Sequence, residues 1–135
     1  MNQLPGTLAS ARLTVEPPLI ASYADLTQDF NPIHLDPAFA AKTPMGGLIA
    51  HGTMSIGLIW QSLEQSLGAA AFADADLDIR FVKPVRLGET LVAGGRLRAD
   101  DPRTYDVWVR AEQDDSDRLI GSLRLAAPLA TGATP

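Results

Sequence analysis

Asp29, His34 and His51 are the residues of this sequence whose types and spacing best suit acid–base chemistry. His34 closely follows the dipeptide Asn31-Pro32, and a proline disfavours the α region for the residue before it. We therefore expect an irregular loop between two helices, and loops held between rigid elements commonly present catalytic groups. In such a loop Asp29 and His34 can converge, whereas residues five apart on one helix would not face each other.

An aspartate and a histidine around one water molecule suit the reversible hydration of an α,β-unsaturated thioester. Water must lose a proton as it attacks C3, and C2 must gain one. Histidine titrates near neutral pH, and a partly buried aspartate can be tuned toward it. The thioester oxygen gains negative charge, and Gly52 can offer it a backbone N–H at the positive end of a helix dipole. Glycine also lets the substrate approach that backbone closely.

Simpler roles for the same residues stay open. The segment that holds Asp29 and Asn31 is also typical of turns and helix caps, and His34 can be a structural hydrogen-bonding residue. A metal site built from Asp29, His34, Asp36 and His51 is a further alternative. His51 taken alone is expected to fix the start of the helix that follows it.

The second half of the chain has an apolar period of two, which predicts half-buried antiparallel strands. The alternation is clearest at 75–81, where apolar residues take the odd positions and charged residues take the even ones. Further strands are expected at 91–97, 105–111 and 119–125, separated by turns at 87–88, 100–102 and 114–117. In the last strand Arg118 falls on the polar, outward-facing side. Residues 9–16 can supply a fifth strand.

The first half shows helical spacing instead. Pro17-Pro18 suits a helix start, and Asp36 suits the N-cap of a short helix that ends at Ala41. A long helix is expected over Gly52–Leu67, with an apolar stripe that includes Ile56 and Trp60; its first turns are nearly apolar all round, so we expect it to be buried on most sides. Gly68 is a suitable stop for that helix.

This order of elements fits an α+β fold in one domain, residues 1–135. A strand, helices, a long buried helix and a four-strand meander together predict a curved antiparallel sheet wrapped around a central helix, a hotdog-like arrangement. Such a sheet leaves an edge and a face uncovered, so we expect a homodimer. Residues 1–8 and 128–135 are expected to be flexible.

Composition limits the classes of function. A net charge of −5 over 135 residues argues against nucleic-acid binding. The absence of cysteine excludes disulfides, a thiol nucleophile and cysteine-ligated zinc. The start of the sequence has no signal-peptide pattern, and the most apolar stretch, Met45–Trp60, is too short and too polar for a membrane span. A cytoplasmic location is therefore the default expectation.

Two motifs in this order resemble a known family. The sequence Asp-Phe-Asn-Pro-Ile-His-Leu-Asp-Pro-Ala-Phe-Ala at 29–40, followed by Gly-Leu-Ile-Ala-His-Gly at 47–52, resembles the signature of the MaoC-like, (R)-specific enoyl-CoA hydratases. The segment Phe-Val-Lys-Pro-Val-Arg-Leu-Gly-Glu at 81–89 is similar to a later sheet motif of that family. The resemblance spans nearly the whole chain, from residue 10 to residue 127.

That resemblance implies a hotdog homodimer that adds water, without metal or redox cofactor, to trans-2-enoyl thioesters and forms (R)-3-hydroxyacyl products. Asp29 and His34 match the catalytic pair, Asn31 matches the residue that orders the loop, and Gly52 matches the oxyanion-hole amide. The carrier is coenzyme A or an acyl carrier protein. His51 is assigned to substrate binding.

The chain departs from the family pattern at two positions. Gln28 replaces the glycine often found before the aspartate, and Trp60 stands where a small hydroxyl residue is expected on the central helix. A tryptophan there is expected to border and narrow the acyl site, and Ser55 cannot be assumed to replace the hydroxyl.

Three basic residues are candidates for binding the phosphates of coenzyme A, namely Lys83 and Arg86 with Arg80 near them.

Two rival functions stay open. One is a hotdog thioesterase, and the other is an acyl-CoA-binding protein without turnover, which the departure at Trp60 favours.

Overall fold

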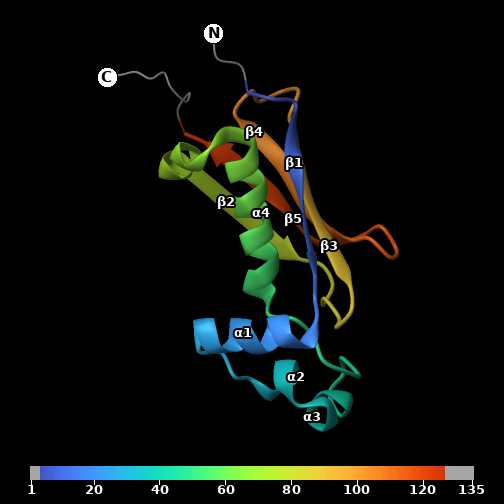
Figure 1. The fold of residues 1–135 in the computed structure, drawn as a ribbon. Coiled ribbons are helices and arrows are strands. Elements are labelled where there is room, and N and C mark those ends of the chain that lie inside the picture. The colour runs from blue at the N-terminus through green and yellow to red at the C-terminus, as the bar shows by residue number, and fades with distance from the viewer. Residues whose placement is uncertain (1–3, 127–135) are drawn as a thin grey trace.

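A computed structural model describes residues 4–126 of the chain (Figure 1). The predicted flexible segment 128–135 lies outside these residues. The elements in chain order are β1 (Thr7–Thr14), α1 (Pro17–Thr27), α2 (Pro32–Leu35), α3 (Pro37–Ala41), α4 (Gly52–Leu67), the 3₁₀ helix η1 (Ala69–Asp74), β2 (Ala75–Phe81), β3 (Thr90–Leu97), β4 (Thr104–Ala111) and β5 (Ser116–Leu125).

The strands form one antiparallel sheet in the order β1-β3-β4-β5-β2. The predicted four-strand meander is therefore wrong for β2, which pairs along its length with β5, from Ala75 opposite Leu125 to Phe81 opposite Leu119. Only β3, β4 and β5 follow one another as neighbours. The segment between β2 and β3 runs from the β2 edge past β5 and β4. Within this segment, the Val85 carbonyl accepts the Ala50 N–H at 2.8 Å.

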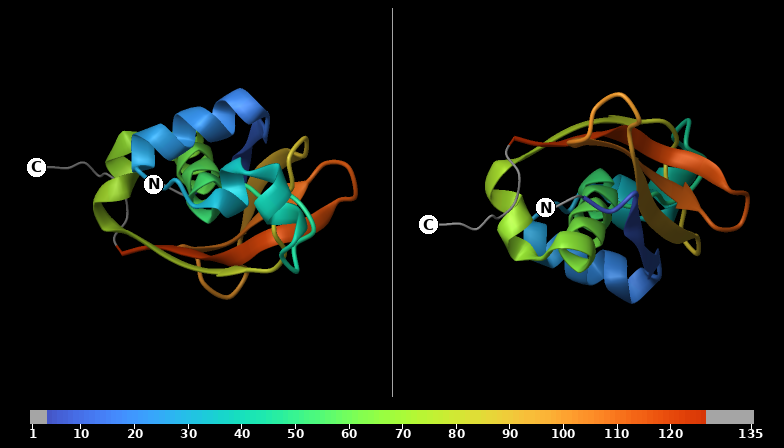
Figure 2. Two further views of the ribbon diagram at one scale, coloured as in Figure 1. Left: turned by 90° about the horizontal axis from the view of Figure 1, so that it is seen from below. Right: turned by 90° about the horizontal axis from the view of Figure 1, so that it is seen from above.

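The sheet curves around α4, which fills its concave side. Seen along the axis of α4, the sheet lies on one side of this helix and α1 lies on the other (Figure 2). The core is formed by the inner positions of the strands, the sheet-facing side of α4, Ile20 of α1 and Val15 between β1 and α1. Its other fully buried side chains are Ile59, Leu63, Leu91, Tyr105, Val107, Val109, Leu119, Leu123 and Leu125. Short α2 and α3 project beyond the lower end of α4 (Figure 1).

Two serines join α4 to a bulge in β1. The pairing of β1 with β3 shifts register between Leu8 and Ala11, which leaves the backbone of Ala9 without its usual strand partner. The Ser62 hydroxyl donates to the Ala9 carbonyl, and the Ala9 N–H donates to the Ser66 hydroxyl at 2.6 Å. Side chains of α4 thus take the place of a neighbouring strand at this edge.

Three local expectations are corrected by the structure. Residues 6–8, expected to be flexible, belong to the sheet: Leu8 is buried and the Leu97 N–H donates to the Gly6 carbonyl at 2.8 Å. The segment expected to be an irregular loop contains α2. The apolar stripe on α4 packs against the core, but its members Ile56 and Trp60 are only partly buried rather than buried on most sides.

The arrangement is the hotdog fold that the sequence predicts, a five-stranded antiparallel sheet around a central helix. Among residues 4–126, no helix is long and apolar enough to cross a membrane.

Candidate active site

His34 is held by the one-turn helix α2. Asn31 caps this helix, since its Oδ1 accepts the Ile33 N–H at 3.0 Å. Pro32 takes the first helical position, where a missing N–H costs nothing. His34 is 9% exposed, and its Nδ1 lies 2.8 Å from the Ile49 carbonyl oxygen. A carbonyl oxygen only accepts hydrogen bonds, so Nδ1 carries the proton and Nε2 presents its lone pair in the neutral ring.

The conformation of α2 explains why a loop was expected. Pro32 does keep Asn31 out of the α region, at φ −56° and ψ 129°. That backbone conformation is also suitable for an N-cap, and a proline at the next position is pre-organised for a helix. The same two residues therefore begin a helical turn instead of preventing one.

Asp29 follows the C-terminal cap of α1. Gln28 has a φ of 59°, in the left-handed region that glycine adopts most easily, which explains why glycine suits this position. Gln28 is held there by a hydrogen bond from its Nε2 to the Asp25 carbonyl at 2.7 Å. The turn brings Oδ2 of Asp29 to 3.9 Å from Nε2 of His34. The two side chains therefore converge, as the spacing predicts.

His51 lies against His34 rather than in the wall of a cavity. The two rings stack with centroids 3.9 Å apart and an angle of 27° between their planes. His51 is 3% exposed, and its Nε2 is 3.0 Å from the backbone carbonyl oxygen of Asp29. It also occupies the N-cap position of α4, but its side chain does not cap the helix.

Beside His34 lies a cavity of about 360 Å³ with a mostly apolar wall. Its polar lining residues are His34, Ser55, Lys83 and Arg118, and the others are Met45, Ile49, Ala50, Gly52, Phe81, Val82, Pro84 and Val85. The cavity lies between the start of α4, the segment before it, and the connection that follows β2. An apolar cavity with few polar groups is typical of a small-molecule site.

Gly52 is the first residue of α4 and lines this cavity. The first N–H groups of a helix have no carbonyl partner within the helix and carry the positive end of its dipole. A side chain at this position would collide with Phe81, because a Cβ atom would lie 2.9 Å from its Cζ. Glycine therefore fits position 52 without a clash. Its N–H is suited to bind an anionic oxygen.

The remaining predicted site residues lie in different places. Lys83 lines the cavity, whereas Arg86 donates to the Met45 carbonyl at the edge of the same region. Trp60 lies elsewhere: its indole packs edge-on against Phe72, 5.7 Å between centroids, and with Ala75 the two line a separate depression.

Ser55 and Arg118 line the cavity and were not assigned to it from the sequence. Ser55 follows Gly52 by three residues, so helical periodicity puts the two on one face; this signal was available. Arg118 was predicted to face outward, but it is 4% exposed. Its Nη2 is 2.6 Å from Oε2 of Glu89 and 3.3 Å from Oδ2 of Asp114.

The ion pair between Glu89 and Arg118 fixes the wall of the cavity. Burial by itself would raise the pKa of Glu89, but hydrogen bonds from the Arg118 side chain and the Arg86 backbone outweigh it and lower that pKa. The Arg118 carbonyl accepts the Val82 N–H at 2.9 Å. Both partners thus hold the connection after β2 in place.

The metal alternative keeps three of its four residues. One potential ligand atom each from Asp29, His34 and His51 lies within 4.8 Å of the others. Asp36 is engaged elsewhere, as the N-cap that accepts two N–H groups of α3. The metal alternative therefore stays open for Asp29, His34 and His51 alone.

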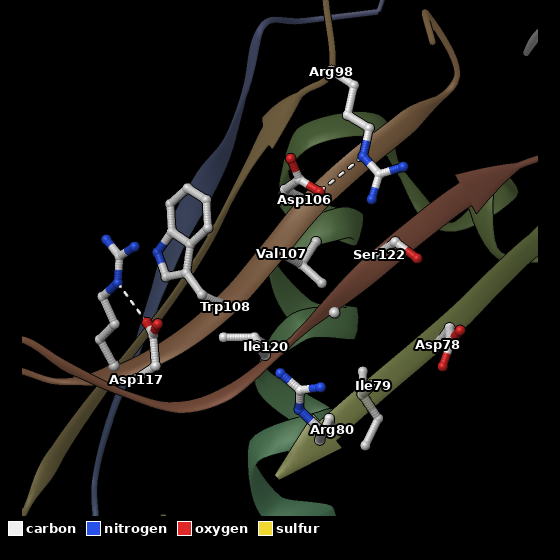
Figure 3. Close-up of a pocket in the computed structure, with 12 residues that line it drawn as sticks. Asp78, Ile79, Arg80, Arg98, Asp106, Val107, Trp108, Asp117, Ile120 and Ser122 are labelled. Carbon is white, nitrogen blue, oxygen red and sulfur yellow. Dashed lines mark hydrogen bonds and ion pairs between the residues drawn. The ribbon is translucent and has the colours of Figure 1, made fainter. Parts of the chain in front are cut away.

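A second depression lies on the outer face of the sheet, across β2, β4 and β5 (Figure 3). Four of its charged residues form two ion pairs: Arg98 is 2.8 Å from Asp106, and Arg110 is 2.9 Å from Asp117. The Arg110 guanidinium also stacks on Trp108, 4.4 Å from the ring centroid. Such pairing is typical of a solvated sheet surface, and this face lies on the opposite side of the sheet from α4.

Comparison with known proteins identifies the family of this chain. The family model described as "MaoC like domain" matches residues 4–109. A 3-hydroxybutyryl-CoA dehydratase of Methylorubrum extorquens is 40% identical over 70 residues, which cover 52% of this chain and 45% of that protein. An (R)-specific enoyl-CoA hydratase of Aeromonas caviae is 37% identical over 86 residues, which cover 62% and 64%. The matched part therefore spans less than two thirds of either relative.

The solved structure of the (R)-hydratase from A. caviae involved in PHA biosynthesis superimposes with a TM-score of 0.68. It is 30% identical and covers 88% of this chain and 96% of that one. The protein thus has the hotdog fold, and the candidate site lies at the start of its central helix. The family model covers most of the sequence, and the chain belongs to the MaoC-like domain family.

Proposed function

We propose that this protein catalyses the reversible addition of water to a trans-2-enoyl thioester, giving an (R)-3-hydroxyacyl thioester. One observation carries the proposal: Nε2 of His34 and Oδ2 of Asp29 are 3.9 Å apart beside the apolar cavity. That separation is too long for a direct hydrogen bond, but one water molecule can bridge both atoms at about 2.8 Å from each. The names of the two relatives support the same reaction class.

Both atoms accept hydrogen bonds when His34 is neutral and Asp29 is ionised. A water molecule between them has two protons to donate, which leaves an oxygen lone pair for attack on C3. As the C–O bond forms, one proton passes to the pair and electrons move from the double bond toward the thioester oxygen. The Gly52 N–H receives that oxygen, and the pair returns a proton to C2. We assign the two transfers to the pair jointly.

The carrier we propose is coenzyme A or an acyl carrier protein. Lys83 in the cavity wall supports this, because a cation there can receive the phosphate of the carrier's phosphopantetheine arm. Arg86 is proposed to assist from the neighbouring loop. We predict from the sequence that the reaction needs no metal or redox cofactor and that the protein is cytoplasmic.

We also infer a homodimer through the free edge of β2. This strand has a neighbour on only one side within residues 4–126, and large apolar side chains near it are exposed, with Phe81 at 53% and Val82 at 46%. Antiparallel pairing of two copies about Ile79 sets Asp78 of one opposite Arg80 of the other. The other edge, β1, is bulged and tied to α4, which disfavours pairing there.

The charge pair gives the dimer a direct test. Arg80→Asp is expected to weaken association in analytical ultracentrifugation, because each contact then opposes two carboxylates. Combining it with Asp78→Arg restores opposite charges and is expected to restore the dimer. Undiminished association of Arg80→Asp would exclude this register.

The reaction is tested by the loss of ultraviolet absorbance of trans-2-enoyl-CoA substrates of several chain lengths. Asp29→Asn and His34→Ala are each expected to lower kcat at least about 10²-fold, since each removes a group that handles the proton. Asp25→Asn, the same chemical change on an exposed position of α1, is the matched control and is expected to keep full activity. A thiol reagent in the same assay detects thioesterase activity.

Full activity of folded Asp29→Asn or His34→Ala would refute the proposed pair. Thiol release without loss of the double bond would favour the thioesterase. Binding of acyl-CoA without either reaction would favour the non-catalytic alternative.

A further inference from the structure

We propose that His51 is a positioning residue that holds both members of the catalytic pair in register, and this inference rests on the proposed function. His51 touches Asp29 through the backbone and His34 through its ring. One side chain thus links the two residues directly. The sequence assigned it to substrate binding or to the start of α4, and neither role explains these contacts.

The side chain is not used to cap the helix. N-cap positions favour serine, threonine, aspartate or asparagine, whose side chains accept a backbone N–H of the first turn. His51 occupies that position with an extended backbone and makes no such bond. Its ring is directed instead toward the loop that carries the catalytic pair.

The contact with Asp29 fixes the tautomer of His51. Nε2 lies 3.0 Å from the Asp29 carbonyl oxygen and must donate to it. Nδ1 is then the unprotonated nitrogen, and it is buried without a hydrogen-bond partner. His34 has the opposite arrangement, with its proton on Nδ1. The two stacked rings therefore hold opposite tautomers.

The two contacts position different parts of the site. The hydrogen bond sets the position of the Asp29 backbone and hence the reach of its carboxylate. The stacking sets the tilt of the His34 ring and hence the direction of Nε2. The two atoms that hold the water, Nε2 of His34 and Oδ2 of Asp29, are only 3.9 Å apart. A displacement of either atom by about 1 Å is therefore expected to lower the rate on the order of 10²-fold.

Two substitutions separate these contacts. His51→Gln keeps an N–H donor at a similar reach and loses the aromatic face, whereas His51→Phe keeps the aromatic face and loses the donor. Each is expected to lower kcat by about 10- to 100-fold with KM changed less than about threefold, because bound substrate is unaffected while the pair is misaligned. Tyr23→Phe is the matched control. It removes a 2.8 Å hydrogen bond to Thr53 at the same helix start, and its kcat is expected to stay within about twofold of wild type.

A second readout does not depend on turnover. The chain has two histidines, so correlation of imidazole protons with ¹⁵N nitrogens gives a spectrum that one variant assigns. We expect a protonated Nε2 in His51 and a protonated Nδ1 in His34. In His51→Gln, the His34 signals are expected to shift and broaden as the ring loses its stacking partner.

The outcomes are distinct. Wild-type kcat in both His51 variants, or a rise in KM with kcat unchanged, would overturn the positioning role. The same tautomer on both wild-type histidines would overturn it as well. If wild-type protein hydrates no enoyl-CoA, the proposed reaction fails, and the tautomers read without substrate still decide whether His51 makes these contacts.

Discussion

Replacement of Glu89 by glutamine is expected to destabilise the protein by breaking its ion pair with Arg118. The Glu89 side chain is 18% exposed and that of Arg118 is 5% exposed. Oε2 accepts from Arg118 Nη2 at 2.6 Å, and Oε1 accepts the Arg86 N–H at 2.8 Å. The amide keeps the shape of the carboxyl group but removes its charge and half of its accepting capacity.

The expected loss in the free energy of unfolding is about 3 kcal/mol. Breaking one partner of a buried ion pair costs about 3–5 kcal/mol, because the remaining charge stays buried. The low end applies here because Asp114 still lies 3.3 Å from Arg118 Nη2, and Ser116 also accepts from that guanidinium. Part of the charge therefore stays compensated.

Urea unfolding at pH 7 measures this loss. The double variant Glu89→Leu with Arg118→Met is the control, because it leaves no buried charge and is expected to recover most of the stability. A loss below about 1 kcal/mol in Glu89→Gln, the size found for exposed pairs, would refute the reasoning. A double variant no more stable than the single one would show that the loss does not come from an unpaired charge.

Three further predictions concern other parts of the structure. Gly52→Ala places a methyl group 2.9 Å from the exposed ring of Phe81. We expect kcat/KM to fall on the order of 10²-fold, while the free energy of unfolding, measured in urea, changes by less than about 1 kcal/mol. Ser62→Ala leaves a carbonyl of the β1 bulge unpaired and is expected to cost about 1–3 kcal/mol in the same assay. Acid should destabilise the wild type, because bonds from Ser116 lower the pKa of Asp114 to about 2 and the pKa of Glu89 is also lowered. Carboxyl groups with depressed pKa values stabilise the fold above their ordinary pKa, so this stability is lost as pH falls from about 4.5 toward 2, and Glu89→Gln should flatten the loss.

Local patterns predicted most of the elements. The predicted bounds 75–81 match β2, with the alternation of burial holding up to the exposed Phe81, and Asp36-Pro37 begins α3 as capping rules require. Strand partners are a different matter, because periodicity shows which face of a strand is buried but carries no information about its neighbour. The sequence therefore placed β2 beside β3, whereas hydrogen bonds put it beside β5.

The site shows the same division. Asp29 and His34 were found because turn chemistry and residue type coincide in a short segment. The burial of Arg118 was missed because the strand pattern predicts only that its side chain faces outward. It does not predict that Glu89, 29 residues away, pairs with it and covers it. The stripe on α4 identified Trp60 as apolar, but only the packing of the connection after β2 decides that Ser55 and not Trp60 reaches the cavity.

The placement of β2 has a consequence for how the chain is made. Its pairing joins residues 38 to 50 positions apart, from Phe81 with Leu119 to Ala75 with Leu125. During synthesis β2 emerges long before β5 and does not find its partner strand until β5 has been made. Closing contacts between such distant residues is slow, so this edge is the part of the nascent protein most exposed to aggregation. A chain cut shortly before residue 116 would keep the catalytic loop and the central helix, yet leave this strand permanently unpaired.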